Sequence, residues 1–165
     1  LALARADADQ HELQREELYL NDLVEESCRA VKVLAQSRQV ALEIEPGEDI
    51  SVQGDPKLLR RMVLNLLDNA LKYTPPGGSV QVALKRNCTN AELFIRDTGI
   101  GIPADAAPHV FDRFYRVDKA RSRAAGGSGL GLPIVKWIAE AHHGSITLQS
   151  QSGIGSTFCV RLPLN

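Results

Sequence analysis

The stretch NLLDNALKYT, residues 65–74, decides the fold class, because its apolar residues continue a helical pattern while its polar residues gather on one side. Asp55 followed by Pro56 is typical of a helix start, since aspartate caps free backbone N–H groups and proline fits the first helical position. Leu59, Val63, Leu66 and Ala70 then recur at helical spacing, until Pro-Pro-Gly-Gly at 75–78 stops the pattern. The sequence therefore predicts an amphipathic helix that begins at Pro56 and ends before Pro75.

The polar residues of this predicted helix lie on one face. Asn65, Asn69 and Lys72 are spaced by four and three residues, and Tyr73 extends their row. Amide oxygens are suitable ligands for Mg²⁺, and an ammonium group neutralises phosphate charge. The face therefore suits a metal–phosphate complex, although a solvated polar face is the alternative interpretation of these residues alone.

A second motif, DTGIGI at residues 97–102, directly follows a predicted strand. Glycines at such a turn let the backbone approach a ligand closely. A carboxylate such as Asp97 accepts a hydrogen bond from an exocyclic amine like that of adenine, whereas guanine presents a carbonyl oxygen there and is repelled. A plain tight turn is the alternative, because Asp and Gly are common turn residues.

A third motif, GGSGLGL at residues 126–132, directly precedes a predicted helix. A glycine-rich loop that leads into a helix N-terminus binds anions, because free N–H groups and the positive end of the helix dipole lie together. The motif lacks the lysine of a phosphate-binding P-loop and follows a loop instead of a strand, so it matches neither the P-loop nor the dinucleotide-binding pattern.

Residues 98–128 contain no long periodic segment, and a stretch of this length inside a compact domain is often a functional lid. Its centre reads FDRFYR, residues 111–116. We expect the aromatic residues Phe111, Phe114 and Tyr115 to anchor the lid, with Arg116 beside them.

The remaining pattern alternates helices with strands that form hairpins. One expected helix is capped by Asn21 or Asp22 and ends near Ser37, and another is 130–141. The expected strands are 13–20, 40–44, 50–52, 80–84, 93–97, 145–150 and 157–162. This order predicts an α/β sandwich with a mixed, mostly antiparallel sheet that helices cover on one face.

Composition excludes several classes of protein. The 165 residues suit one domain, and 19 basic against 20 acidic residues give a net charge of −1, which argues against nucleic-acid binding. No apolar run approaches the roughly 20 residues that span a bilayer, so we expect no membrane contact by this segment. The three cysteines and four histidines show no metal-binding or disulfide spacing.

Together and in this order, the motifs resemble those of the ATP-binding catalytic domain of sensor histidine kinases, within the wider family that includes Hsp90 chaperones, type II topoisomerases and MutL repair proteins. NLLDNALKYT resembles the N box, DTGIGI the G1 box, FDRFYR the F box and GGSGLGL the G2 box. GIGSTF, residues 153–158, resembles the terminal Gly/Thr element. The resemblance covers about residues 13–165 and implies a Bergerat-type ATP-binding fold.

The resemblance implies a role for each matching residue. Asn69 would ligate Mg²⁺, with Asn65 assisting at the metal or the phosphates, and Lys72 and Tyr73 would contact phosphates or ribose. Asp97 would bind the adenine amine. The other expected nucleotide-binding residues are Gly99, Gly101 and Ile102 around the adenine, Gly127, Gly129, Leu130, Gly131 and Leu132 over the phosphates, and Thr157 in the adenine-side hydrogen-bond network. The ATP lid would span about 103–128.

Asn65 separates branches of this family. The water-activating ATPases carry glutamate at this position as a general base, and an amide cannot take up a proton at neutral pH. The resemblance therefore implies that the γ-phosphate of ATP passes to a histidine on the dimerisation domain of the same sensor kinase, and then to an aspartate on the receiver domain of a response regulator.

We expect residues 1–12 to be the end of the dimerisation helix and a linker, and residues 13–165 to be the catalytic domain. His11 lacks the Arg-Thr-Pro continuation of an acceptor motif, so the acceptor histidine should lie upstream of this chain. We expect His142 and His143 to end the last helix, facing the negative end of its dipole. The isolated domain should be monomeric and cytoplasmic, and its parent membrane-anchored. The alternatives are a nucleotide-sensing module without turnover and a self-sufficient ATPase.

Overall fold

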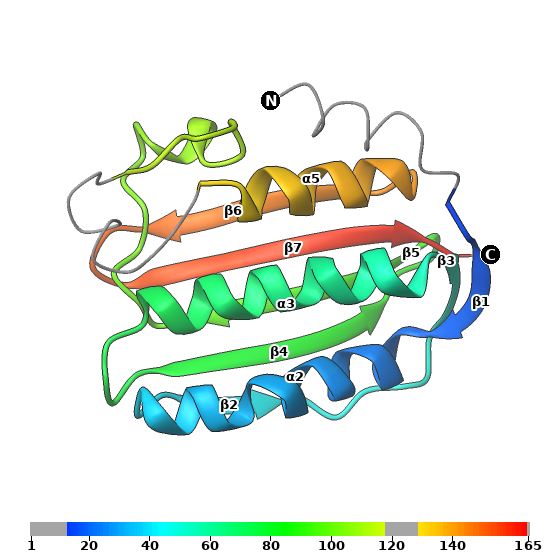
Figure 1. Cartoon of the computed structure of the whole chain (residues 1–165), viewed down its shortest axis with the longest axis horizontal. Helices are drawn as coiled ribbons and strands as arrows, with labels where there is room; N and C mark the ends of the chain where they lie inside the picture. The colour runs from blue at the N-terminus through cyan, green and yellow to red at the C-terminus, as the bar shows by residue number, and fades with distance from the viewer. Residues whose placement is uncertain (1–12, 118–128, 165) are drawn as a thin grey trace.

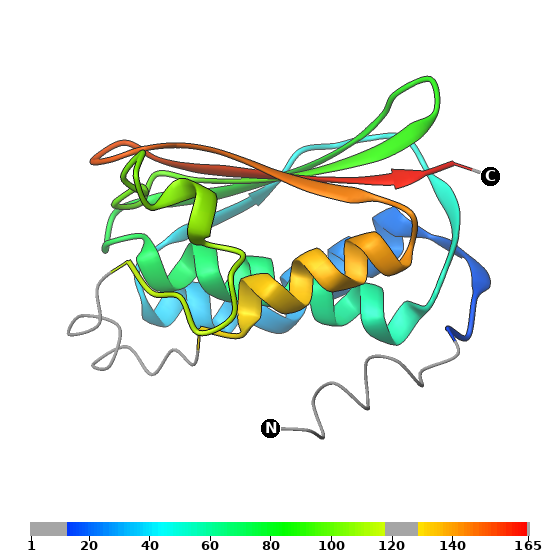
Figure 2. The same ribbon diagram turned by 90° about the horizontal axis from the view of Figure 1, so that it is seen from above.

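The computed structural model describes residues 13–117 and 129–164, which form two layers, a sheet and a layer of helices (Figures 1 and 2). The helices are α2 (Leu20–Ser37), α3 (Pro56–Tyr73), the short 3-10 helix η1 (Ala107–His109) and α5 (Gly131–Ala141). The strands are β1 (Glu16–Tyr19), β2 (Ala41–Ile44), β3 (Ser51–Gly54), β4 (Ser79–Arg86), β5 (Asn90–Asp97), β6 (Ser145–Gln151) and β7 (Gly155–Pro163).

The main sheet has the strand order β2-β4-β5-β7-β6. Its β2–β4 pair is parallel and the other three pairs are antiparallel, so the prediction of a mixed, mostly antiparallel sheet is confirmed. Helices α2, α3 and α5 lie side by side on one face of this sheet (Figure 1). A separate antiparallel pair, β1 with β3, closes one end of the domain.

The core lies between the helices and the sheet. Leu66 and Ala70 of α3 are buried there, as the helical spacing predicted. On β5 and β7, alternate side chains face the helices, and Ile95 and Phe158 are among those that are almost completely buried. The strand ends therefore place every second side chain on the helix side, where the predicted site lies.

The ends of α3 follow the sequence signals. Asp55 is the N-cap, and its Oδ1 accepts hydrogen bonds from the backbone N–H groups of Lys57 (3.0 Å) and Leu58 (3.2 Å). The helix ends at Tyr73, before Pro75. Among the described residues, no helix combines the length and apolar character that crossing a membrane requires.

The predicted N-cap of α2, Asn21 or Asp22, was wrong by two or three residues, since the N-cap is Tyr19. The helix begins at Leu20, and Asn21, a candidate cap, lies inside it. Asn21 instead bonds across to the segment before β3: its Oδ1 accepts from the Ile50 N–H (3.2 Å) and its Nδ2 donates to Asp49 (2.9 Å). A long-range contact uses the polar side chain that the local pattern assigned to capping.

Candidate functional site

The described parts of the predicted motifs meet at one end of the domain, at the left in Figure 1. Helix α3 ends there with Tyr73, β5 ends there with Asp97, and α5 begins there with Gly131. The turn between β6 and β7 closes the same end. Segments far apart in the sequence thus place their polar groups around one region.

The polar face of α3 borders this region. Asn65, Asn69 and Lys72 are half-buried, and the amides of Asn65 and Asn69 form no hydrogen bond with any residue in the described ranges. The Lys72 ammonium lies 5.4 Å from the centre of the Tyr73 ring, a cation–π distance. Two half-buried amides without partners are consistent with groups that bind a ligand.

The turn at residues 97–102 packs directly against the end of α3. The Ile100 N–H donates to the Tyr73 carbonyl oxygen (3.1 Å), and a Cβ on Gly99 would lie 2.4 Å from the same oxygen. Gly101 has a φ of +68°, and a Cβ there would lie 2.0 Å from the Gln151 carbonyl oxygen. Both glycines are therefore required by close backbone packing, which also positions Asp97.

Asp97 is only 5% exposed. Its Oδ1 accepts hydrogen bonds from the backbone N–H groups of Gly99 (2.8 Å) and Ser156 (3.3 Å). No described residue donates to Oδ2. Burial raises the pKa of Asp97 above 3.8, and the two backbone donors oppose that rise. The structure thus fixes one carboxylate oxygen and leaves the other for a ligand that donates.

Thr157 does not lie beside Asp97, so this part of the predicted hydrogen-bond network was wrong. In the β5–β7 register, Asp97 pairs with Ser156, whereas Thr157 pairs with Arg96. Because side chains alternate along a strand, Thr157 points to the face of the sheet away from the helices, and Ser156 points to the helix side. Ser156 takes the place that the sequence interpretation gave to Thr157.

Ser150 and Ser156 are candidate site residues that the sequence interpretation missed. Their hydroxyl oxygens are 2.8 Å apart, and the Ser150 Oγ also accepts from the Ile102 N–H (2.8 Å). The two serines thus connect Asp97 to Ile102, the last residue of the G1 box. Ser156 alternates along β7 with the buried residues Phe158 and Val160. This alternation is the sequence signal that could have placed Ser156 on the helix side of the sheet.

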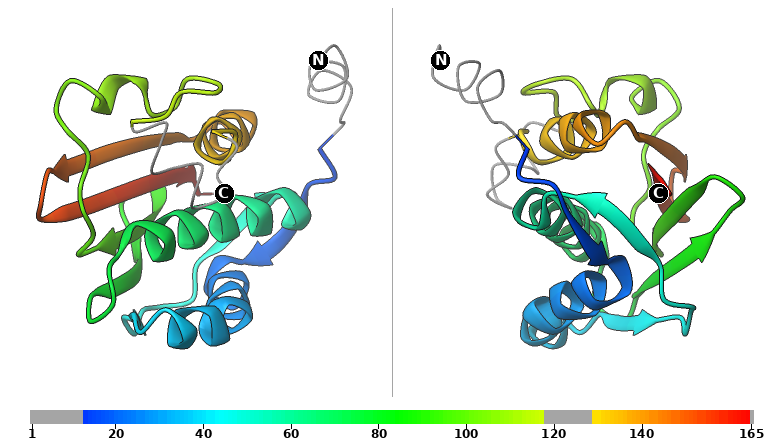
Figure 3. Two further views of the ribbon diagram at one scale, coloured as in Figure 1. Left: turned by 60° about the vertical axis from the view of Figure 1, so that its left-hand side comes forward. Right: turned by 90° about the vertical axis from the view of Figure 1, so that its right-hand side faces the viewer.

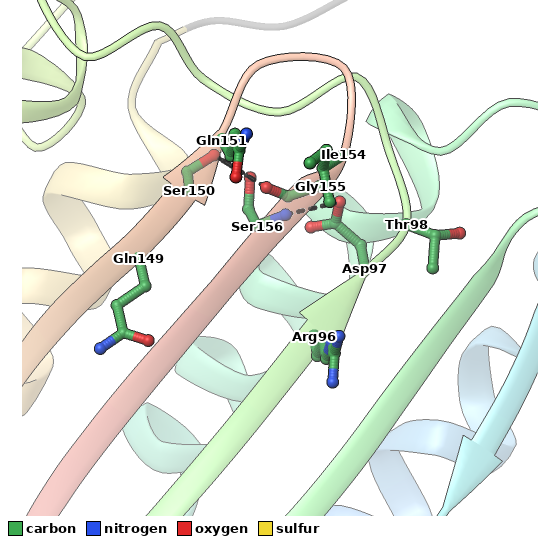
Figure 4. A pocket seen from close by; sticks show the side chains of 9 residues that line it. All are labelled: Arg96, Asp97, Thr98, Gln149, Ser150, Gln151, Ile154, Gly155 and Ser156. Atoms are coloured by element: carbon green, nitrogen blue, oxygen red, sulfur yellow. Dashed lines mark hydrogen bonds between the residues drawn. The ribbon is translucent and has the colours of Figure 1, made fainter.

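A depression of about 330 Å³ lies at the same end of the sheet, with Asp97 in its wall (Figure 4). Its other lining residues are Arg96, Thr98, Gln149, Ser150, Gln151, Ile154, Gly155 and Ser156. Arg96 and Gln149 are exposed side chains of the outer face, which alternation separates from the helix side. The lining therefore combines outer-face side chains with Asp97 and Ser156 of the helix side.

The lid segment is anchored by part of the predicted aromatic set. Phe111 is half-buried and lies edge-on to Phe158 of the sheet, with 6.3 Å between ring centres. Tyr115 is half-buried and contacts the His109 ring at 5.4 Å. Phe114 is 59% exposed and has a φ of +63°, so the expectation that it anchors the lid was wrong. Its backbone places the ring outward, because its N–H donates to the Gly129 carbonyl oxygen (3.1 Å).

The N-terminus of α5 faces the same region. The helix starts at Gly131, and a Cβ on that residue would lie 3.6 Å from the Asn65 Oδ1. Gly129, Leu130 and Leu132 are half-buried around this start, whereas Gly127 lies outside the described residues. In the lid segment, Arg116 has a buried guanidinium nitrogen, Nη2, that has no hydrogen-bond partner among the described residues.

Within residues 13–117 and 129–164, no three or more His, Cys, Asp or Glu side chains cluster in a way that could hold a metal ion. A metal at this site would therefore depend on other oxygen ligands, such as the side-chain amides of α3.

Comparisons with known proteins agree with this geometry. Residues 54–165 match the family described as histidine kinase-, DNA gyrase B-, and HSP90-like ATPase. The sensor-like histidine kinase SenX3 of Mycolicibacterium smegmatis is 44% identical over 144 residues, which are 87% of this chain and 38% of SenX3. The chain thus spans well under half the length of this curated relative.

Solved structures give the same result. The mycobacterial sensor histidine kinase MprB is 33% identical, with a TM-score of 0.77 over 92% of this chain and 98% of that one. The catalytic domain of histidine kinase ThkA has a TM-score of 0.80 over 92% and 96% of the two chains, and its 24% identity supports the fold alone. This chain therefore belongs to the ATP-binding domains of the histidine kinase-, DNA gyrase B- and HSP90-like ATPase family, and its relatives are sensor histidine kinases.

Proposed function

We propose that this chain is the catalytic domain of a sensor histidine kinase, which binds ATP with Mg²⁺ and transfers the γ-phosphate to a histidine on the dimerisation domain of the same protein. The observation that carries the proposal is the convergence of three groups at one end of the domain: the free amides of α3, the buried carboxylate of Asp97, and the N-terminus of α5. The amides can ligate a metal ion, the carboxylate can accept from the amine of a base, and the helix N-terminus can bind phosphates.

Asp97 supports the assignment of adenine. Its Oδ1 is held by two backbone N–H groups, which leaves Oδ2 as an acceptor for an exocyclic amine. A guanine carbonyl oxygen at the same place would face a buried carboxylate with no donor between them. Ser156 and Ser150 extend the hydrogen-bond network beside the base and connect it to Ile102.

The phosphates would lie between α3 and the start of α5. Lys72 supplies a positive charge, and the first turn of α5 supplies free backbone N–H groups and the positive end of its dipole. The buried Arg116 nitrogen without a partner supplies a further donor. A buried guanidinium nitrogen without a partner is costly, and a phosphate oxygen would satisfy it.

The donor set fits Mg²⁺. Asn69 and Asn65 offer amide oxygens from one face of α3, and Mg²⁺ prefers oxygen ligands that it shares with substrate phosphates. The bound ion would neutralise phosphate charge. Asn69 would hold it, and Asn65, which faces the start of α5, would assist at the ion or the phosphates.

Asn65 also supports transfer to an acceptor instead of water. Its amide cannot take a proton from a water molecule at neutral pH, so this site lacks a general base at that position. Catalysis here would consist of positioning and charge neutralisation, with the acceptor histidine prepared on its own domain. The phosphoryl group would then pass to an aspartate on a response-regulator receiver domain, and a membrane anchor would belong to the parent protein upstream.

The deciding experiment mixes the full 165-residue chain with the separately purified dimerisation domain of its parent kinase and γ-labelled ATP. We expect acid-labile, alkali-stable label on that domain, lost with Asn69→Ala and kept with Thr157→Val, a matched change on the outer face. ATP binding without any phosphohistidine would overturn the kinase assignment in favour of a nucleotide-sensing module. Steady phosphate release by the chain alone, lost with Asn69→Ala, would instead identify an ATPase.

A further inference from the structure

The hydroxyl group of Ser150 lies at a junction of chain segments that are distant in the sequence. Ser150 belongs to β6, and the turn that follows this strand lies beside the segment that follows β5 (Figure 3, left). Between these two segments, the Gly153 N–H donates to the Ile100 carbonyl oxygen (2.7 Å). The Ile102 N–H donates to the Ser150 Oγ (2.8 Å). Ser150 thus joins β6 to the end of the turn that begins at Asp97.

Ser150 makes three hydrogen bonds, and two of them have a fixed direction. A backbone N–H can only donate, so the Ser150 Oγ accepts from Ile102. A carbonyl oxygen can only accept, so the single hydroxyl proton of Ser150 points to the Gly155 carbonyl oxygen, 3.0 Å away. The third partner is the Ser156 hydroxyl oxygen at 2.8 Å. Because the Ser150 proton is already used, Ser156 must donate in this third bond.

This order of protons leaves Ser156 as an acceptor toward the proposed base site. Its hydroxyl has one proton, which lies in the bond to Ser150, whereas its oxygen keeps its lone pairs. Its backbone N–H is also used, since it donates to the Asp97 Oδ1 (3.3 Å). Ser156 is only 7% exposed, so protein groups and not bulk water set the direction of its hydroxyl. Ser156 therefore offers a ligand oxygen lone pairs and no proton.

Ser156 and Asp97 form one wall with two acceptors. They are direct partners across β5 and β7 and lie next to each other (Figure 4). Directly opposed residues have Cβ atoms about 4.5–5.5 Å apart, so one small ligand group can meet both side chains. An exocyclic amine has two N–H groups that can donate to Asp97 and Ser156, directly or through a bridging water. A carbonyl oxygen in the same place would face lone pairs on both residues.

We propose that Ser150 is a positioning residue that determines base specificity: it takes the proton of Ser156 and thereby keeps Ser156 an acceptor beside Asp97. Ser150 acts through Ser156 and not on the ligand, because its own proton and both its lone pairs are used. The inference rests on the proposed function and deepens it, since it adds a selection against a base carbonyl to the selection that Asp97 makes.

The order of protons can be tested without nucleotide. A neutron crystal structure of the full chain in heavy water should place the Ser156 deuteron between the two serine oxygens. The Ser150 deuteron should point to the Gly155 carbonyl oxygen. A Ser150 deuteron that points to the Ser156 oxygen would overturn the proposal, whether or not the chain binds ATP.

Calorimetric titration with ATP and with inosine triphosphate (ITP) measures the consequence for binding, since the base of ITP carries a carbonyl oxygen where adenine carries its amine. Ser150→Ala frees the Ser156 proton to donate to that carbonyl. The ratio of ATP affinity to ITP affinity should therefore fall about two- to twelvefold, the range of one neutral hydrogen bond. Ser150→Thr keeps the hydroxyl and should keep the ratio. The matched control Ser145→Ala, at an exposed position of β6, should also keep it.

A double variant separates this role from a general loss of structure. In a Ser156→Ala background, adding Ser150→Ala should leave the ratio of ATP to ITP affinity unchanged, because no Ser156 proton remains to be released. A Ser150→Ala ratio equal to that of the wild type, or the same fall in the Ser156→Ala background, would contradict the proposal. A wild-type chain that binds neither nucleotide would refute the proposed function and the base selection with it, whereas the deuteron positions decide the order of protons by themselves.

Discussion

Replacing Asp97 with asparagine changes a single oxygen at the centre of the proposed adenine site. Asparagine keeps an oxygen that accepts from Gly99 and Ser156, so the turn at residues 97–102 should retain its backbone geometry. The second oxygen, which no described residue occupies, becomes an NH₂ donor. Two donors would then face each other where the adenine amine should bind.

The expected loss follows from one charged hydrogen bond. Hydrogen bonds to charged groups contribute about 1.5–3 kcal/mol. Since 1.36 kcal/mol corresponds to a factor of ten, ATP affinity should fall about ten- to 150-fold. Stability should stay the same or rise, because the variant no longer buries a carboxylate whose pKa burial has raised.

Calorimetric titration with ATP and with GTP measures both the loss and the base preference. The wild type should prefer ATP, and Asp97→Asn should narrow that preference. Thr157→Val is the matched control, since Thr157 pairs with Arg96 on the outer face and should leave affinity unchanged. An Asp97→Asn affinity within twofold of wild type, in a variant whose thermal stability is not reduced, would refute the adenine assignment.

Four further predictions test the site and its support. Gly101→Ala should lower the free energy of unfolding in urea by about 2–5 kcal/mol, because the new Cβ would meet the Gln151 carbonyl oxygen at a φ of +68°. Gly77→Ala, at a φ of +86° in open space, should lower it by only about 1–2 kcal/mol. Equal losses would contradict the packing argument. The ratio of the ATP affinity of the wild type to that of Asp97→Asn should fall as pH falls through the raised pKa of Asp97, because protonation removes the charged acceptor. A ratio that stays constant from neutral pH down to 3.8 would exclude the Asp97 carboxylate as the group that binds the base. The same raised pKa means that Asp97 contributes stability that is present at low pH and lost as pH rises from 3.8 through the folded-state value. Asp55→Ala should lower the free energy of unfolding by about 1–2 kcal/mol through loss of the α3 cap. The control Asp68→Ala, at an exposed position of the same helix, should lower it by less than about 0.5 kcal/mol. Similar losses in the two variants would show that the cap contributes nothing.

Helix α3 and the turn at Asp97 could be predicted because their signals are local. Asn65, Asn69 and Lys72 share a face through helical spacing alone, and a strand followed by DTGIGI ends in a turn whatever the strand pairs with. The sandwich architecture followed from the order of such segments, and the sheet topology and the solved structures of relatives confirm it.

Other features depended on partners distant in the sequence. The assignment of Thr157 failed because the register of β7 against β5 decides which side chain faces the helices. Phe114 points outward because its backbone pairs with Gly129, beyond the lid segment. Asn21 bonds to residues 49 and 50 instead of capping its own helix.

The sequence by itself determined the chemistry of this protein: which amides share a helix face, which carboxylate ends a strand, and which glycines let the backbone approach closely. Only the tertiary structure decided the arrangement: that Ser156 and Ser150 bond beside Asp97, and that His142 joins α5 to the cap of α3. The physical reason is that helical spacing is fixed within one segment, whereas strand register and buried hydrogen bonds are fixed by the partner that each segment meets on folding.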